Sequence, residues 1–237
     1  KVRGPRVVGT FRCCWVDPQT GKWPMYPDSP LVNPKVRQAL NKAINRDEMN
    51  KAFFQGKAET MYLNHFHPTR LGYNKEWEGK FQDLYGYDVA KAKQLLAEAG
   101  FPNGFKTQMV IKTLPGVPGT GDLAEAVAAY WRAIGVQASL EPVEVPQDRA
   151  IYSKFGYQNT VTLDASGSNQ WSGQTIWNSG YSHLGIGVEN PKVDALLRQI
   201  ATTVDQGKQE EMWRQLLEVN ANVEKLRRSH RCARRLG

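Results

Sequence analysis

Apolar residues recur along this chain with two periods, one typical of helices and one typical of strands. Spacings of three and four residues predict amphipathic helices over 33–44, 45–56, 88–99, 123–134, 190–200 and 206–223. Alternation and short apolar runs predict strands near 7–15, 107–113, 136–140 and 159–163, and a short helix is expected from Gln147. Alternating helices and strands predict an α/β lobe.

Polar residues at the predicted helix starts support these boundaries. Asn33 followed by Pro34 places a capping side chain before a proline at the first helical position. Asn45 precedes Glu48 by three residues, as in a capping box. Asp88 is expected to cap the helix with the clearest apolar stripe.

Three stretches show no clear period. Residues 1–32 hold five prolines and three glycines, which predicts extended segments and turns. Residues 57–87 are rich in aromatic side chains and are expected to form a long, partly ordered excursion. Residues 164–189, rich in Gly, Ser, Asn and Trp, predict an irregular loop.

Composition narrows the classes of protein. The 237 residues are 41% hydrophobic and 23% charged, which is ordinary for a globular chain and argues against a disordered or fibrous one. No run approaches the roughly 18 uncharged apolar residues of a membrane helix. The net charge of +8 includes six basic residues in 225–237, so the rest has 31 − 6 = 25 basic against 23 acidic residues. A nearly neutral body with a basic tail does not favour nucleic acid as a partner.

No metal or disulfide pattern is evident. His65 and His67 alternate, but no third ligand accompanies them, so ordinary polar roles are the better interpretation. Cys13 and Cys14 are adjacent and Cys232 lies in the basic tail, which predicts thiols rather than a disulfide framework. Phosphate-loop, dinucleotide-loop and nucleophile-elbow signatures are absent from the sequence.

The irregular loop after residue 163 offers the best candidate for a ligand site. Trp171 and Trp177, with Asn169 and Gln170 nearby, combine aromatic rings and amides that suit an organic ligand. The alternative, that the two tryptophans pack under their own loop, has equal weight.

Four segments, in order, resemble the extracellular solute-binding proteins of family 5, the peptide, dipeptide and nickel receptors of ABC importers. They are NPKVRQALNKAINRDEMNKAFFQGKAE, YGYDVAKAKQLLAEAGFPNGF, AEAVAAYWRAIGVQASLEPVE and ENPKVDALLRQIATTVDQGKQEEMWRQL. Together they span residues 33 to 220, so the resemblance does not depend on any one motif.

The resemblance implies an α/β, periplasmic-binding-protein-like (class II) lobe with a mixed sheet flanked by helices. Residues 1–32 would be an inter-lobe crossing segment, 33–224 the C-terminal solute-binding lobe, and 225–237 a basic tail that is disordered or frame-shifted. A full member is about twice this length, so we expect a fragment of a monomeric receptor in the periplasm or at the cell surface. It implies a peptide or small-molecule ligand, an ABC permease as partner, no cofactor and no catalysis.

The resemblance also implies site residues. Peptide-binding members place an aspartate, which pairs with the peptide amino terminus, at the position of Ser166 in this sequence. Asp164 lies two residues earlier, and would substitute if the backbone stays extended. Because this sequence has a serine where the family has an acid, a sugar or another polar solute remains an alternative ligand. Ser166, Asn169 and Trp171 would line its site, with Trp177 nearby.

Other classes of function remain as alternatives. Similar lobes occur as ligand-sensing domains of transcriptional regulators. A hydrolase would use Asp164 with His183, or with the pair His65 and His67. A nucleic-acid binder that uses residues 225–237 ranks last.

Overall fold

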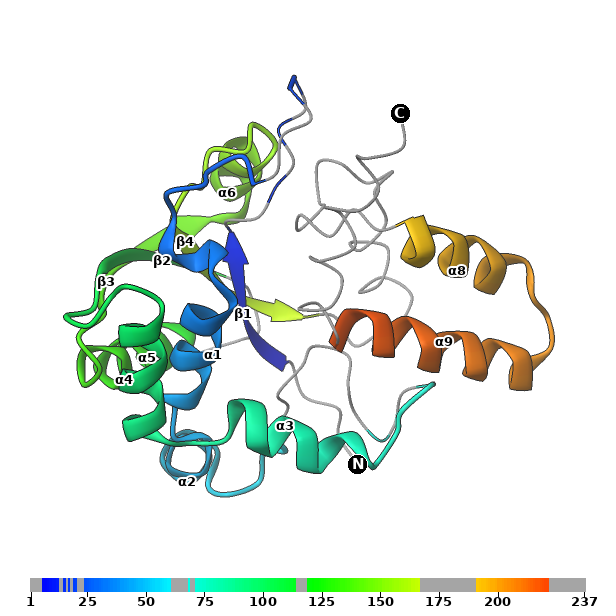
Figure 1. The fold of residues 1–237 in the computed structure, drawn as a ribbon, viewed down its shortest axis with the longest axis horizontal. Helices are drawn as coiled ribbons and strands as arrows, with labels where there is room; N and C mark the ends of the chain where they lie inside the picture. Colours follow the sequence, from blue (N-terminus) through cyan, green and yellow to red (C-terminus); the bar gives the residue numbers. More distant parts are fainter. Residues whose placement is uncertain are drawn as a thin grey trace.

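The computed structural model describes residues 6–12, 15, 17, 19–20, 24–60, 68, 71–113, 119–166 and 191–221. In these residues a four-stranded sheet has the order β1-β4-β2-β3, formed by β1 (Arg6–Arg12), β2 (Lys106–Thr113), β3 (Gln137–Glu144) and β4 (Thr160–Ser166). Strand β2 is parallel to β3 and β4, whereas β1 runs antiparallel to β4 (Figure 1). The mixed α/β sheet confirms the predicted fold class.

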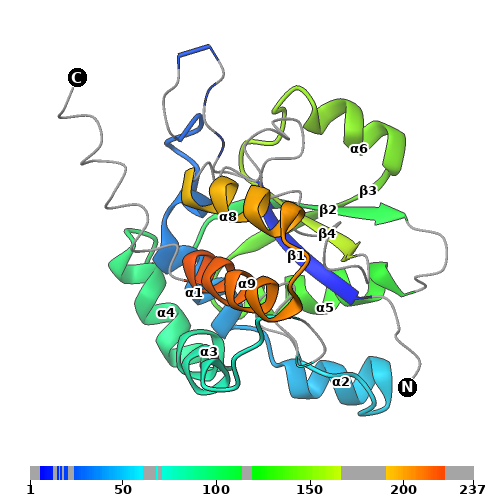
Figure 2. The ribbon, with the colours of Figure 1, turned by 90° about the vertical axis from the view of Figure 1, so that its right-hand side faces the viewer.

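The helices between the parallel strands cover opposite faces of the sheet. Helix α5 (Thr120–Arg132) joins β2 to β3, and α6 (Val145–Tyr152) joins β3 to β4. Figure 2 shows α5 and α6 on either side of the sheet. Met109 and Ile111 of β2 pack in the cluster that contains α5, whereas Val110 packs with Tyr152 of α6, as the alternation of a strand requires.

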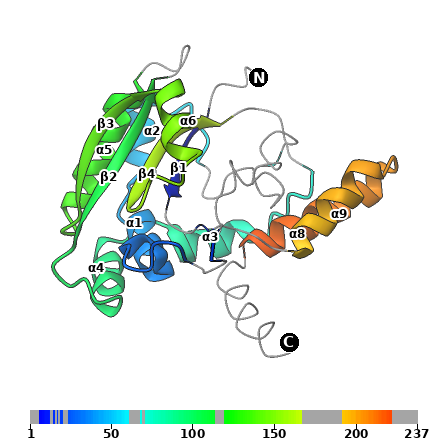
Figure 3. The same cartoon turned by 90° about the horizontal axis from the view of Figure 1, so that it is seen from above.

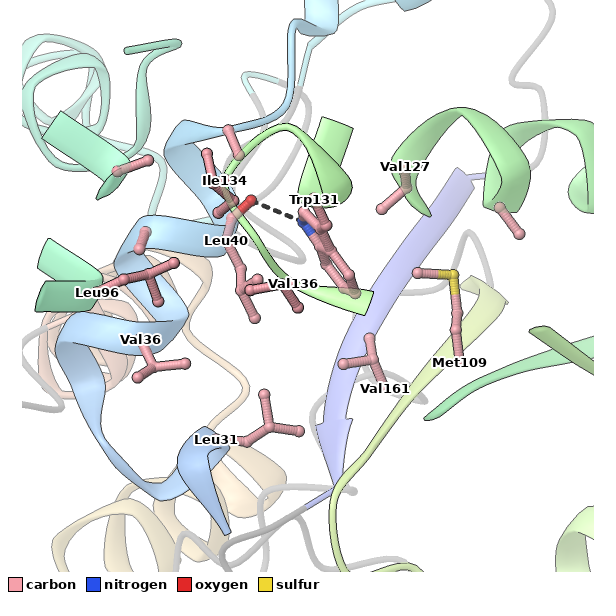
Figure 4. Close-up of a cluster of buried hydrophobic side chains, with 14 of the residues drawn as sticks. Leu31, Val36, Leu40, Leu96, Met109, Val127, Trp131, Ile134, Val136 and Val161 are labelled. Carbon is pink, nitrogen blue, oxygen red and sulfur yellow. Dashed lines mark hydrogen bonds between the residues drawn. The ribbon is translucent and has the colours of Figure 1, made fainter. Parts of the chain in front are cut away.

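The main hydrophobic core lies on the α5 face, under α1 (Pro34–Lys42) and α4 (Val89–Glu98), with the short 3₁₀ helix Pro30–Val32 at its margin. Figure 4 shows its buried side chains between these helices and the sheet. The indole Nε1 of Trp131 donates to the carbonyl of Leu40 at 3.0 Å, which ties α5 to α1.

The predicted caps are confirmed. Asn33 accepts a hydrogen bond from the backbone of Lys35 at the start of α1, and Asp88 accepts one at the start of α4. Asn45 accepts from the N–H of Glu48 at 3.1 Å and starts α2 (Arg46–Phe54). The carboxylate of Glu48 itself accepts a hydrogen bond from the hydroxyl of Tyr130 at 2.8 Å, which links α2 to α5.

The prediction of an irregular excursion over 57–87 was wrong in its last part, where α3 (Trp77–Tyr85) forms. Trp77, Phe81 and Tyr85 recur every four residues, but aromatic neighbours outside the helix hide this period. The N-cap position, Glu76, makes no side-chain capping hydrogen bond, so the usual start signal is absent.

A second hydrophobic cluster joins α3 to α8 (Pro191–Thr202) and α9 (Gln206–Ala221). The α8–α9 hairpin projects away from the sheet, with α3 between it and α1 (Figures 1 and 3). Gly72 packs against the backbone of α9, where a Cβ would lie 2.4 Å from the nitrogen of Arg214. No helix within the described ranges is long and apolar enough to cross a membrane.

Candidate functional site

The carboxyl ends of the parallel strands form the candidate site. Strand β2 ends at Thr113 and β4 ends at Ser166, in the centre of the sheet. Ligands of open α/β sheets bind outside the carboxyl ends of the strands. The first residues of β1 lie at the same edge, because Arg6 pairs with Ser166 and Val8 pairs with Asp164.

Two of the five predicted site residues fall on this edge. The backbone from Asp164 to Ser166 is extended and paired with β1, which is the condition under which Asp164 would substitute for the family's acid. Asn169, Trp171 and Trp177 lie outside the described residues. Their roles, and those of Asp164 and Ser166 toward a ligand, therefore stay predictions.

Polar side chains also line the α6 face of the sheet toward the amino end of β4, away from the carboxyl edge. Thr160 and Thr162 alternate with Val161 and Leu163, which enter the main core, and both threonines are buried. The hydroxyl of Thr160 donates to Oε1 of Gln108 at 2.8 Å. This hydrogen bond satisfies two of the polar side chains that the sheet buries beneath α6.

Arg12 is buried on the same face. It is 8% exposed, its Nε donates to Oγ1 of Thr162 at 3.1 Å, and its guanidinium carbon lies 4.2 Å from the ring centroid of Tyr152. Burial raises the pKa of Tyr152, while the charge and hydrogen bonding of Arg12 act in the opposite direction. The Tyr152 hydroxyl is therefore a neutral group beside a buried cation.

A buried ion pair fixes α6 on this face. Nζ of Lys112 lies 2.9 Å from Oδ2 of Asp148, and the hydroxyl of Tyr157 donates to Oδ1 of Asp148 at 3.0 Å. Burial, followed by the charge of Asp148, raises the pKa of Tyr157. The sequence pattern does not predict this cluster, although a lysine at the second-last position of an apolar strand is a signal for it.

Aromatic side chains cover the cluster. The ring of Trp15 lies 6.2 Å from Tyr26, 5.9 Å from Tyr152 and 5.6 Å from Phe155, measured between ring centroids. Among the described residues, no group of three or more His, Cys, Asp or Glu is placed to hold a metal ion.

Comparison with known proteins places this architecture in a family. The family described as bacterial extracellular solute-binding proteins, family 5 Middle, matches residues 11–185. That range includes the end of β1 and all of β2, β3 and β4, together with the predicted site residues.

Curated relatives share about 40% of the aligned residues. Heme-binding protein A of Haemophilus influenzae is 40% identical over 147 residues, which are 61% of this chain and 24% of the relative. The dipeptide-binding protein of Escherichia coli is 39% identical over 144 residues, 59% of this chain and 25% of the relative. The glutathione-binding protein GsiB of Salmonella typhimurium is 41% identical over 153 residues, 62% of this chain and 27% of the relative. The matches thus span about a quarter of these relatives' length.

Solved structures share the fold. HbpA2 from Haemophilus parasuis superposes with a TM-score of 0.65 at 24% identity, over 91% of this chain and 42% of that one. A dipeptide-binding protein from Pseudoalteromonas sp. SM9913 in complex with Met-Leu superposes with a TM-score of 0.66 at 20% identity, over 90% and 40%. At these identities the likeness concerns the fold alone.

Proposed function

The chain belongs to the bacterial extracellular solute-binding proteins of family 5, and we propose that it is the C-terminal lobe of a receptor that captures a peptide or another polar solute for an ABC importer. The family match over residues 11–185 carries the proposal, because it covers the parallel strands and their carboxyl edge. In this proposal residues 1–32 cross between lobes, 33–224 form the solute-binding lobe and 225–237 are a tail.

The names of the relatives support the class of solute. They include a dipeptide-binding and a glutathione-binding protein, and one solved structure holds the peptide STSA. Ser166 stands where the resemblance places the family's acid, and Asp164 lies two residues earlier in the same extended strand. We therefore assign Asp164 to the amino group of the solute, with Ser166, Asn169, Trp171 and Trp177 as further lining.

The mechanism is capture without a chemical step. The solute enters between this lobe and the rest of the receptor, which closes on a hinge and buries it. The closed state is favoured by the difference in solute affinity between the two states. The closed receptor then docks on the permease outside the cytoplasm. One lobe supplies only part of the contacts, so we expect weak or no binding by the 237-residue chain alone.

A chimera tests the proposal. Residues 11–185 replace the matching segment of the E. coli dipeptide-binding protein, with a control chimera that carries the corresponding segment of GsiB from S. typhimurium. Circular dichroism verifies folding, and isothermal titration with pools of di- to pentapeptides and of monosaccharides measures binding. Binding of a pool by the folded chimera supports the proposal.

Two results contradict it. A folded chimera that binds neither pool, while the control chimera binds peptide, removes solute capture from this segment. Micromolar binding by the 237-residue chain alone contradicts the division of contacts between two lobes. Loss of peptide binding on Asp164→Asn, with Asp122→Asn as an exposed control, tests the assignment of Asp164.

A further inference from the structure

The main hydrophobic core and the second hydrophobic cluster have no member in common among the described residues. The main core joins α1, α4 and α5 to the sheet. The second cluster joins α3 to α8 and α9, and its buried members are Trp77, Phe81, Val193, Leu196, Leu197, Ile200, Trp213, Leu216 and Leu217. Burial of apolar side chains therefore stabilises each cluster separately.

Helix α3 belongs to the second cluster along its whole length. The ring centroids of Trp77 and Phe81 are 5.7 Å apart, and those of Phe81 and Tyr85 are 6.1 Å apart. All three side chains pack in the second cluster, with α8 and α9. Figure 3 shows α3 between the α8–α9 hairpin and α1. The boundary between the two clusters therefore lies between α3 and α1.

Polar side chains cross this boundary at the carboxyl end of α3. Three donors from α1 and the start of α2 each reach one carbonyl there: Gln38 that of Leu84 at 3.0 Å, Lys42 that of Gly86 at 3.4 Å, and Arg46 that of Tyr85 at 3.3 Å. The last carbonyl groups of a helix have no intrahelical donor, so these side chains supply what α3 lacks. Gln38 and Lys42 lie one turn apart on the same side of α1.

These hydrogen bonds are weaker than the clusters on either side of them. A hydrogen bond contributes little net free energy, because water replaces the partner when the contact opens. Each cluster instead buries many apolar side chains, whose exposure to water is costly. Separation of α3 from α1 is therefore expected to cost less free energy than unfolding of the main core.

We propose that α3, α8 and α9 form one unit that opens from the rest of the lobe while the sheet and the main core stay folded. The contacts of Gln38, Lys42 and Arg46 with the end of α3 hold this unit closed. Residues 167–190 run from β4 in the sheet to α8 in the unit, and they include three predicted site residues. If the proposed function holds, opening frees one end of this segment and weakens solute capture.

Hydrogen exchange of the 237-residue chain at low urea concentrations tests the proposal. The amides of α3, α8 and α9 are expected to share one opening free energy, and to be protected at least about 10-fold less than the slowest amides of α4, α5 and β2. Opening of the unit exposes less surface than global unfolding does. Exchange in the unit is therefore expected to depend less steeply on urea.

Two variants distinguish the unit from the main core. Leu96→Ala, at a position of α4 that is 0% exposed, is expected to speed exchange in the main core at least about 30-fold and to leave α8 and α9 unchanged. Gln38→Met, which removes the donor and keeps the length of the side chain, is expected to speed exchange in α8 and α9 about 3- to 10-fold.

The control for Gln38→Met is Gln94→Met. Gln94 is exposed and donates to Glu98 on the same helix at 2.8 Å, so it makes no contact across the boundary in its hydrogen bond. We expect Gln94→Met to leave exchange in α8 and α9 unchanged. If Leu96→Ala does not fold, the urea dependence of exchange in the unchanged chain still decides.

Two results contradict the proposal. If α8 and α9 are protected as strongly as the main core and respond to Leu96→Ala by the same factor, the lobe unfolds as one body. If Gln38→Met and Gln94→Met have equal effects on α8 and α9, the contact of Gln38 with α3 does not hold the unit closed. Separate opening in a chain whose chimera binds no solute would remove the proposed function and leave the unit standing.

Discussion

Lys112 of β2 and Asp148 of α6 form a buried ion pair, with 2.9 Å between Nζ and Oδ2 and side-chain exposures of 12% and 5%. Removal of one partner leaves the other charge buried without compensation. We predict that Lys112→Met lowers the free energy of unfolding by about 3–5 kcal/mol, measured by urea denaturation.

The matched control is Lys35→Met. Lys35 pairs with Glu98 at 2.7 Å, but the side chains are 47% and 37% exposed, so we expect a change of about 0–1 kcal/mol. Equal losses in the free energy of unfolding would show that burial of the ion pair between Lys112 and Asp148 does not increase its contribution to stability.

Three tyrosines are expected to lower the stability of the fold at alkaline pH. Burial, together with the hydrogen bond to Glu48, raises the pKa of Tyr130 to about 12, and burial raises the pKa of Tyr152 and Tyr157. Each folded pKa lies above the unfolded value of about 10, so the unfolded chain loses protons first. Stability is unaffected by these groups below about pH 10, and we predict that it falls from there toward pH 12.

Titration of tyrosinate absorbance checks this prediction. Tyr130→Phe is expected to remove one late-titrating group and to reduce the slope of stability against pH above about pH 10. Stability that rises between pH 10 and pH 12 would contradict the conclusion that the folded state holds these tyrosine hydroxyl groups neutral.

Gly104 and Gly135 meet at a close backbone contact, in which a Cβ on Gly104 would lie 2.0 Å from the carbonyl oxygen of Gly135. Gly104 also has a φ of +76°. Gly100 has a φ of +92°, but a Cβ there meets nothing within 4 Å. We predict that Gly100→Ala costs about 1–2 kcal/mol through backbone strain alone, and that Gly104→Ala costs clearly more. Equal thermal midpoints for the two variants would contradict the contact.

Trp131 supplies a donor that the end of α1 lacks. Leu40 lies in the last turn of α1, where carbonyl groups have no intrahelical donor, and its buried carbonyl accepts the indole N–H at 3.0 Å. We predict that Trp131→Phe, measured by urea denaturation, costs about 1–3 kcal/mol for the unsatisfied carbonyl, in addition to lost packing. Retention of full stability would show that water replaces the indole.

Local chemistry explains which parts of this fold the sequence predicts. Asn33, Asn45 and Asp88 cap helices through residues two or three positions away, so their roles are readable from the chain. Lys112 and Asp148 are 36 positions apart and meet because α6 folds back on β2, which no local pattern reports. Strand β4 was expected to end at Leu163, but pairing with β1 carries it to Ser166.

The residues near the candidate site likewise include some that the sequence predicts and some that it does not. Asp164 and Ser166 are predicted from the family resemblance, and both lie on β4, within the part of the chain that the structure describes. Arg12 is predicted only as part of a strand and not as a member of the buried polar cluster beneath α6, because its burial depends on Thr162 and Tyr152, which are distant in the sequence. Side-chain chemistry alone does not distinguish such a buried arginine from a solvated one.

The antiparallel pairing of β1 with β4 has a consequence for how the chain is made. Arg12 and Thr162 are separated by 150 positions, yet their side chains are hydrogen-bonded between the neighbouring strands β1 and β4. During synthesis from the amino terminus, β1 leaves the ribosome long before its partner exists. The contacts among α1, α4, β2, α5 and β3 join segments closer in sequence and are expected to form first. Completion of the sheet is then a late, slow step, because pairing across large sequence separation is slow, and β1 stays an unpaired strand until residue 166 has emerged.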